Sequence, residues 1–282
     1  MTSAFRGTAE IVQPPAFVFE FLGYVAVYVV DVNVFLLVAA FAGGALNAVA
    51  GGGSFIALPA LIFAGVPPVS ANATTTLALW PASVSSVWAY RRELSAARSW
   101  AVSFAAVSFI GGLLGGLLLL RTTDTSFLRL LPWLLLTTAV TFTFGDRIQR
   151  AARRDSDGSA PRPAREAPLL VLAFQLVIAI YGGYFGGGMG IMMLAALRIA
   201  GMRDIHEMNA VKALLGGIIN GVALAEFIAL GAIVWAPGLV MIAGGVAGGY
   251  VGAATARRTE QKYVRALITV VAWGMTIYFF LR

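Results

Sequence analysis

Four residues in the second half of the chain share one face of a predicted helix. Asn209, Lys212, Gly216 and Asn220 follow one another at spacings of three, four and four, which stacks their positions along one side. Lys212 is one of only two lysines, and it lies within an otherwise apolar segment. Polar residues in such segments usually face the bundle interior. We therefore predict that Lys212 and Asn220 bind an anionic substrate; the alternative is a lysine that snorkels to the interface or sets topology.

A second polar stripe matches the first at an offset of 137 residues. It consists of Asn72, Thr75, Leu79 and Ser83. We expect Asn72, Thr74, Thr75 and Asn209 to orient the anion by hydrogen bonds. The alternative for the two asparagines is that they cap or bridge helices.

Two glycine-rich segments precede short apolar runs at matching places. They are Gly51-Gly52-Gly53-Ser54 and Gly187-Gly188-Met189-Gly190, 136 residues apart. A helix N-terminus carries unpaired N–H groups and about half a positive charge, and such termini bind anions. We predict that Gly52, Gly53, Ser54, Gly188 and Gly190 contribute to the same site. Close helix packing or a tight turn is the alternative.

Other candidate chemistry is sparse. Glu226 lies inside a predicted span and is our candidate for proton coupling; a wetted carboxylate near the interface is the alternative. A dyad of Ser54 and His206 is disfavoured because Phe55, not glycine, follows the serine. With one histidine and no cysteine, we expect no catalytic residue, no metal site and no cofactor.

The composition places these residues in a membrane. Of 282 residues, 59% are hydrophobic and 12% charged, and the mean hydropathy is +0.85. Too little polar surface remains to cover a soluble globule, so a soluble enzyme and a nucleic-acid partner are both disfavoured. The basic residues that give the net charge of +7 lie mostly between apolar runs, as the positive-inside rule requires.

The apolar runs form two similar sets of five elements. We predict an N-terminal extension over 1–30, a first transmembrane repeat over 31–146, a polar cytoplasmic linker over 147–167 and a second repeat over 168–282. The extension could be an extra helix, a surface helix or part of the first span. The predicted elements are 31–50, 54–65, 70–90, 99–120 and 126–145, then 168–186, 189–200, 206–229, 235–256 and 263–281. The second element of each set reaches only about 18 Å and is a half-helix.

Loop charges indicate that the two repeats are inverted. The loop 66–70 is uncharged, whereas the equivalent loop of the second repeat carries Arg198 and Arg203. The next loop carries Arg91, Arg92 and Arg98, whereas its equivalent, 230–234, is uncharged. The fold class we expect is therefore an all-α polytopic transmembrane bundle of two inverted repeats, with the C-terminus outside. A parallel four-plus-four arrangement would leave this reversal unexplained.

Several motifs resemble the TauE/SafE sulfite-exporter family. In the first half they are Asn47-Ala48-Val49-Ala50-Gly51-Gly52-Gly53-Ser54, Ala71-Asn72-Ala73-Thr74, Leu77-Ala78-Leu79-Trp80-Pro81 and Tyr90-Arg91-Arg92-Glu93-Leu94. In the second half they are Tyr181-Gly182-Gly183-Tyr184-Phe185-Gly186-Gly187-Gly188-Met189-Gly190 and Asn209-Ala210-Val211-Lys212. The resemblance spans about residues 34–281 and adds Asn47 to the candidate substrate-binding residues.

This resemblance implies a multi-pass permease of the bacterial inner membrane that exports sulfite, sulfoacetate or related organosulfonates, with proton coupling. A passive anion channel and a non-transporting membrane scaffold are the alternatives. The expected partners are a small anion and the lipid bilayer; the sequence does not decide whether the chain forms a homo-oligomer.

Overall fold

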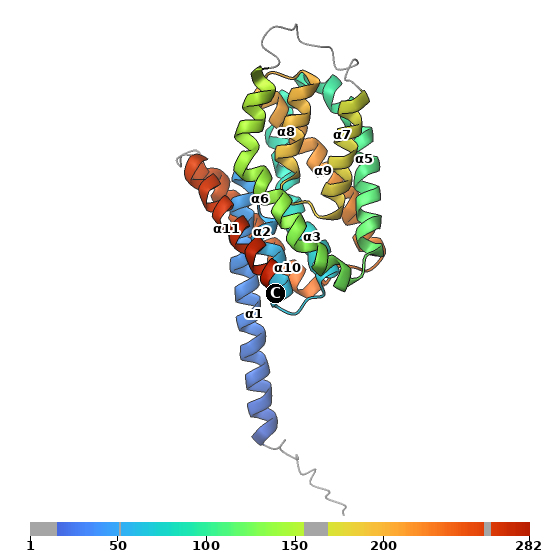
Figure 1. The fold of residues 1–282 in the computed structure, drawn as a ribbon. Helices are drawn as coiled ribbons and strands as arrows, with labels where there is room; N and C mark the ends of the chain where they lie inside the picture. The colour runs from blue at the N-terminus through green and yellow to red at the C-terminus, as the bar shows by residue number, and fades with distance from the viewer. Residues whose placement is uncertain (1–15, 51, 155–168, 257–260) are drawn as a thin grey trace, which may run out of the picture.

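The computed structural model describes residues 16–50, 52–154, 169–256 and 261–282 (Figure 1). Across these ranges the regular elements are all helices, which confirms the predicted all-α class. Their bounds are α1 Ala16–Ala50, α2 Ser54–Phe63, α3 Pro68–Ala89, α4 Arg91–Ala96, α5 Arg98–Arg121, α6 Asp124–Arg154, α7 Leu169–Tyr184, α8 Met189–Ala200, α9 Ile205–Ala229, α10 Trp235–Ala256 and α11 Gln261–Leu281.

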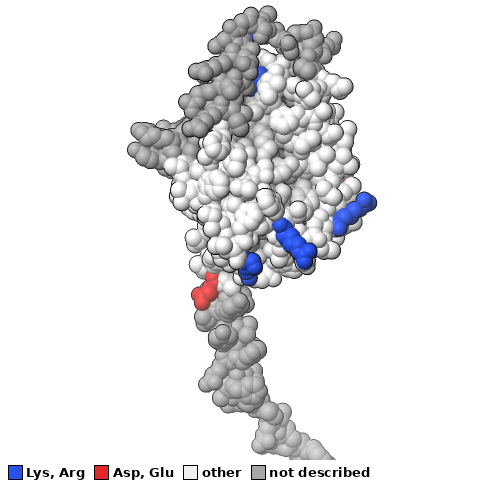
Figure 2. All heavy atoms as spheres, viewed as in Figure 1, with Lys and Arg blue, Asp and Glu red and all other residues white. Residues whose placement is uncertain are grey.

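Five of these helices contain segments long and apolar enough to cross a bilayer. The segments are Val30–Asn47, Arg98–Arg121, Asp124–Gly145, Ile205–Ala229 and Trp235–Gly252. Helices α2, α7 and α8 are apolar but shorter. The surface agrees with this assignment, since Figure 2 shows a broad face without charge over the middle of the bundle. The chain is thus a polytopic membrane protein.

The observed helix bounds change two predicted boundaries and add one short helix. Residues 16–30 extend the first helix, because α1 is continuous from Ala16. Helix α6 runs on to Arg154, eight residues into the predicted linker, where Ala, Arg and Gln have high helix propensity. The rest of that linker, 155–167, lies outside the described residues, as does the segment 1–15. The six-residue helix α4 was not predicted, since it is too short to show a period.

Glycine faces hold the two most extensive helix pairs together. In the pair α1–α10, Gly44 lies against Gly245, and Gly248 against the backbone of Phe41. In the pair α5–α7, Gly115 lies against the backbone of Ile180, and Gly183 against Gly112. Small residues let helix backbones approach closely in lipid. A methyl group at Gly44, Gly248, Gly115 or Gly183 would collide with backbone atoms of the facing helix.

The packing partners of the two halves correspond. Helix α10 packs on α1 and α3, while α5 packs on α7 and α9. The short helices follow the same rule, because α2 packs on α1 and α3, and α8 on α7 and α9. Figure 1 shows α7 and α8 together in the upper part of the view, and α2 lower down beside α1 and α11. Helix α6 contacts elements of both halves, namely α3 of the first half and α8 and α11 of the second.

Candidate functional site

The second glycine break is a tight reversal between α7 and α8. Helix α7 ends at Tyr184, and α8 begins at Met189. Between them, Gly186 (φ +81°) and Gly188 (φ +74°) adopt the left-handed conformation. Only glycine enters this region without steric cost. The chain therefore needs glycine here for its backbone conformation, and the N-terminus of α8 is presented inside the bundle.

The polar stripe of α9 lies along this break. A methyl group built on Gly190 would lie 3.4 Å from Cδ of Lys212, and one built on Gly186 would lie 3.6 Å from Oδ1 of Asn220. Between them, Cε of Met189 would lie 3.6 Å from a methyl group on Gly216. The structure thus brings the predicted stripe and the predicted break together.

Lys212 is half-buried, and its charge is paired only with a neutral group. Its Nζ donates a hydrogen bond to Oδ1 of Asn209 at 3.0 Å. Within the ranges that the structure describes, no carboxylate forms an ion pair with Lys212. This geometry leaves a cation beside the first turn of α8, where the helix dipole adds further positive potential.

Two residues that the sequence analysis missed hold the break in place. The hydroxyl of Thr138, on α6, lies 2.6 Å from the hydroxyl of Tyr181 and donates to the carbonyl of Gly187 at 3.1 Å. The carbonyl of Leu134 lies 3.3 Å from the Tyr181 hydroxyl oxygen and shares the single Tyr181 proton with Thr138. Thr138 is one of several threonines on α6 and gave little signal by itself, because its partners are 43 and 49 residues away in the chain.

The first glycine break is built differently. Gly53 has right-handed helical geometry (φ −59°, ψ −32°), so its conformation does not demand glycine. A methyl group there would instead lie 2.9 Å from Cβ of Asn47 and against the carbonyl of Gly43. Gly52 is buried and Ser54 half-buried; Gly51 lies outside the described residues. Gly53 is therefore closely packed between Gly43 and Asn47. Among the described residues, no contact links Gly53 to the polar stripe of α9.

The stripe on α3 is used mainly for helix contacts. Nδ2 of Asn72 donates to the carbonyl of Tyr184 at 2.9 Å, and the hydroxyl of Thr74 accepts the backbone N–H of Val234 at 3.1 Å. These two side chains therefore bridge helices, which was the alternative for Asn72. Oδ1 of Asn72 and Oγ1 of Thr75 are buried without a hydrogen-bond partner in the described structure. The buried hydroxyl of Thr75 is therefore available to form a hydrogen bond with an anion.

Glu226 is partly buried on α9, near the end of that helix. Both carboxylate oxygens are buried and have no hydrogen-bond partner within the described ranges. They occupy the space left by the absent side chain of Gly116 on α5, where a methyl group would overlap Oε2. A carboxylate so enclosed is costly in its ionised form.

The loop before α9 carries a well-defined cap. Asp204 accepts the backbone N–H groups of Glu207 at 2.9 Å and His206 at 2.8 Å. These bonds, that of Glu207 foremost, lower the pKa of the Asp204 carboxyl. The cap fixes the start of the helix that carries Lys212.

Comparisons with known proteins identify a family and several relatives of this chain. The family model described as Sulfite exporter TauE/SafE matches residues 35–279. A probable membrane transporter protein, ORF9, from a Sinorhizobium species is 30% identical over 245 residues, which is 86% of this chain and 90% of that protein. A probable membrane transporter protein of Haemophilus influenzae is 29% identical over 251 residues, 88% of this chain and 94% of its own length.

A further relative, the probable membrane transporter protein YfcA of Escherichia coli, is 27% identical over 243 residues, covering 86% of this chain and 87% of that protein. No solved structure matches the chain. The class is therefore a polytopic helical membrane transporter. The chain belongs to the TauE/SafE family, as its motifs indicated.

Proposed function

We propose that this transporter is a secondary permease of the bacterial inner membrane that exports sulfite, sulfoacetate or related organosulfonates. The observation that carries the proposal is the position of Lys212 beside Gly190, at the first turn of α8. A sulfonate or sulfite group needs positive charge and hydrogen-bond donors. Lys212 supplies the charge, and the start of α8 supplies backbone N–H groups near it.

An inverted repeat would explain how such a site opens to each side in turn. The exchange of packing partners supports a two-fold relation between the halves, because α1–α10 corresponds to α5–α7 and α3–α10 to α5–α9. The reversed loop charges supply the argument for inversion. Discontinuous helices at matching places of two inverted halves form substrate sites in many secondary transporters. Alternating access would then come from movement of one set of helices against the other around α6.

Glu226 is the residue we propose for proton coupling. Its carboxylate is enclosed between α9 and α5 without a partner in the described structure. An enclosed carboxylate changes its charge only by binding or releasing a proton. Export of an anion coupled to this step would depend on the pH difference across the membrane.

Flux measured in proteoliposomes tests the proposal. We expect the wild type to transport sulfite and sulfoacetate, and Lys212→Met to reduce transport by about 10-fold to 100-fold, as for loss of one charge-assisted bond. Glu226→Gln should retain anion binding but lose the response to a pH gradient. Unchanged flux in Lys212→Met would refute the site, flux in wild type that ignores the pH gradient would indicate a channel, and no flux of any oxyanion would favour a scaffold.

A further inference from the structure

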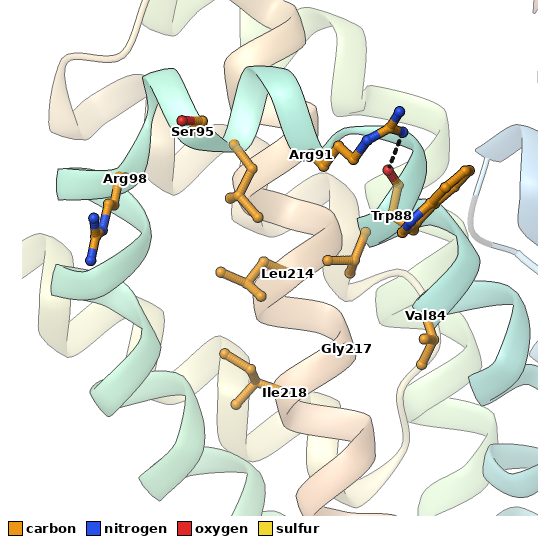
Figure 3. Close-up of a pocket in the computed structure, with 10 residues that line it drawn as sticks. Val84, Trp88, Arg91, Ser95, Arg98, Leu214, Gly217 and Ile218 are labelled. Atoms are coloured by element: carbon orange, nitrogen blue, oxygen red, sulfur yellow. Dashed lines mark hydrogen bonds between the residues drawn. The ribbon is translucent and has the colours of Figure 1, made fainter.

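A groove separate from the candidate substrate site opens on the surface of α9. It has a volume of about 680 Å³ and lies where α3, α4 and α5 meet α9 (Figure 3). Its apolar walls include Val84 and Val87 from α3, and Leu214 and Ile218 from α9. Lys212 is not among the residues that line it. The groove is therefore not an extension of the Lys212 stripe.

Two arginines stand at the end of the groove that α4 closes. Arg91 and Arg98 both line it, and Figure 3 shows them on opposite sides of the groove, with their guanidinium groups pointing away from each other and with Leu214 and Ile218 lower in the view. Arg91 is held in place by Trp88: its guanidinium carbon lies 4.3 Å from the ring centroid, and Nη1 donates to the Trp88 carbonyl at 3.2 Å. The acidic residue of α4, Glu93, does not line the groove, and its Oε2 is buried.

This pattern matches a molecule with an anionic head and an apolar tail. A free oxyanion would gain from the arginines but not from the apolar walls, and an uncharged chain would gain only from the walls. Trp88 is 70% exposed, and an exposed tryptophan beside arginines is typical of the membrane interface. Basic pockets between membrane helices bind anionic lipid head groups.

We propose that the groove binds one anionic phospholipid, with its phosphate at the end of the groove that Arg91 and Arg98 line and an acyl chain along Val84, Leu214 and Ile218. Each arginine near an anionic head group contributes about 1 kcal/mol, which corresponds to about a five-fold change in affinity. The lipid would fasten α4 and the ends of α3 and α5 to the helix that carries Lys212. The site does not depend on what the transporter carries.

Native mass spectrometry of the purified full-length chain tests the proposal, with titration of phosphatidylglycerol against phosphatidylcholine of equal chain length. We expect one phosphatidylglycerol to bind more tightly than phosphatidylcholine. Arg91→Gln and Arg98→Gln should each lower that preference about five-fold. Arg92→Gln is the matched control, because Arg92 lies on α4 but outside the groove. Each single variant keeps two arginines in this loop, so the charge that orients the chain is largely retained.

Two further arms identify the occupant. Val84→Phe narrows the groove without removing charge and should weaken phosphatidylglycerol binding, whereas glycerol phosphate alone should bind far more weakly than the lipid. The proposal is overturned if Arg91→Gln and Arg98→Gln keep the full preference, if Arg92→Gln loses as much as they do, or if the wild type shows no preference. Equal binding of glycerol phosphate and lipid would also overturn it.

Discussion

The two glycine breaks look alike in sequence but differ in the structure. The second reverses the chain through left-handed Gly186 and Gly188 and faces a lysine, an asparagine and the Thr138 hydroxyl. The first, at Gly53, is right-handed and fits tightly against Gly43 and Asn47. At the second break the glycines lie beside polar side chains, whereas at the first break Gly53 lies against backbone and the Asn47 Cβ atom.

This difference shows how a duplicated fold can specialise. Similar glycine runs give both halves an interrupted helix, but the charged residue lies in only one stripe: Lys212 on α9 corresponds to Thr75 on α3. Anion recognition would then rest mainly on the second half, with the first half supplying a rigid counterpart. The predictions that follow compare equivalent or neighbouring residues to test that division.

The largest expected effect on stability is at Gly188. Gly188→Ala places a side chain in the left-handed region, which costs about 1–2 kcal/mol, and its methyl group also collides with Thr138, which adds about 1–3 kcal/mol. We expect a lower melting temperature and less folded protein by size-exclusion chromatography. Gly190→Ala is the control, since its methyl group would only touch Lys212 at 3.4 Å. Equal stability of the two variants would show that the left-handed geometry is not required.

Thr138→Val should have the next largest effect. It removes the hydrogen bonds to Tyr181 and Gly187 and should cost about 1–3 kcal/mol of unfolding free energy, because buried groups lose their partner. Thr141→Val, on the same helix, loses only the bond to its own helix at Thr137 and should cost less. Denaturant unfolding in detergent measures both, and a cost at Thr141 equal to that at Thr138 would argue against the clamp.

Valine substitutions at Thr74 and Thr75 should differ in their effect on stability. Thr74→Val removes the partner of the partly buried backbone N–H of Val234 and should cost about 1 kcal/mol. Thr75→Val removes a buried hydroxyl that has no hydrogen-bond partner in the described structure and should leave stability nearly unchanged. If Thr75 contacts the anion, its valine variant will raise the KM for transport while its melting temperature stays at the wild-type value. A stable variant with wild-type KM would remove Thr75 from the site.

The smallest effect is expected at Asp204. Because capping bonds lower the folded-state pKa of this carboxyl, its contribution to stability is present above the ordinary Asp pKa of about 3.9. It is lost as the pH falls through the lowered folded value. The melting temperature of Asp204→Ala should therefore lie slightly below wild type at neutral pH, and the gap should close in acid. A gap that widened in acid would contradict the assigned cap.

Much of the fold could be predicted because apolar runs of bilayer length leave few alternatives. The ten predicted elements correspond to α1–α3 and α5–α11. The short helix α4 and the extension of α6 were not predictable, since neither is an apolar run. At the site, spacing was enough to predict the Lys212 stripe and the glycine break beside it.

The remaining site features depend on distant contacts. Nothing local to Thr138 or Tyr181 shows that they meet, and a glycine triplet does not reveal which glycine is left-handed. Asn72 and Thr74 were both predicted to orient the anion, Asn72 as part of the polar stripe and Thr74 as its near neighbour in sequence. Their hydrogen bonds go to Tyr184 and Val234, more than a hundred residues away, so the tertiary structure determines their role.

Single-cysteine labelling can test whether the anion binds at the second glycine break. The chain has no cysteine, so Gly190→Cys and its counterpart Ser54→Cys each introduce one thiol. We expect sulfoacetate to slow maleimide labelling at position 190, to have a smaller effect at position 54, and to give no protection at 190 when Lys212 is changed to Met. Labelling at 190 that proceeds equally with and without sulfoacetate, or protection confined to 54, would contradict anion binding at the second break.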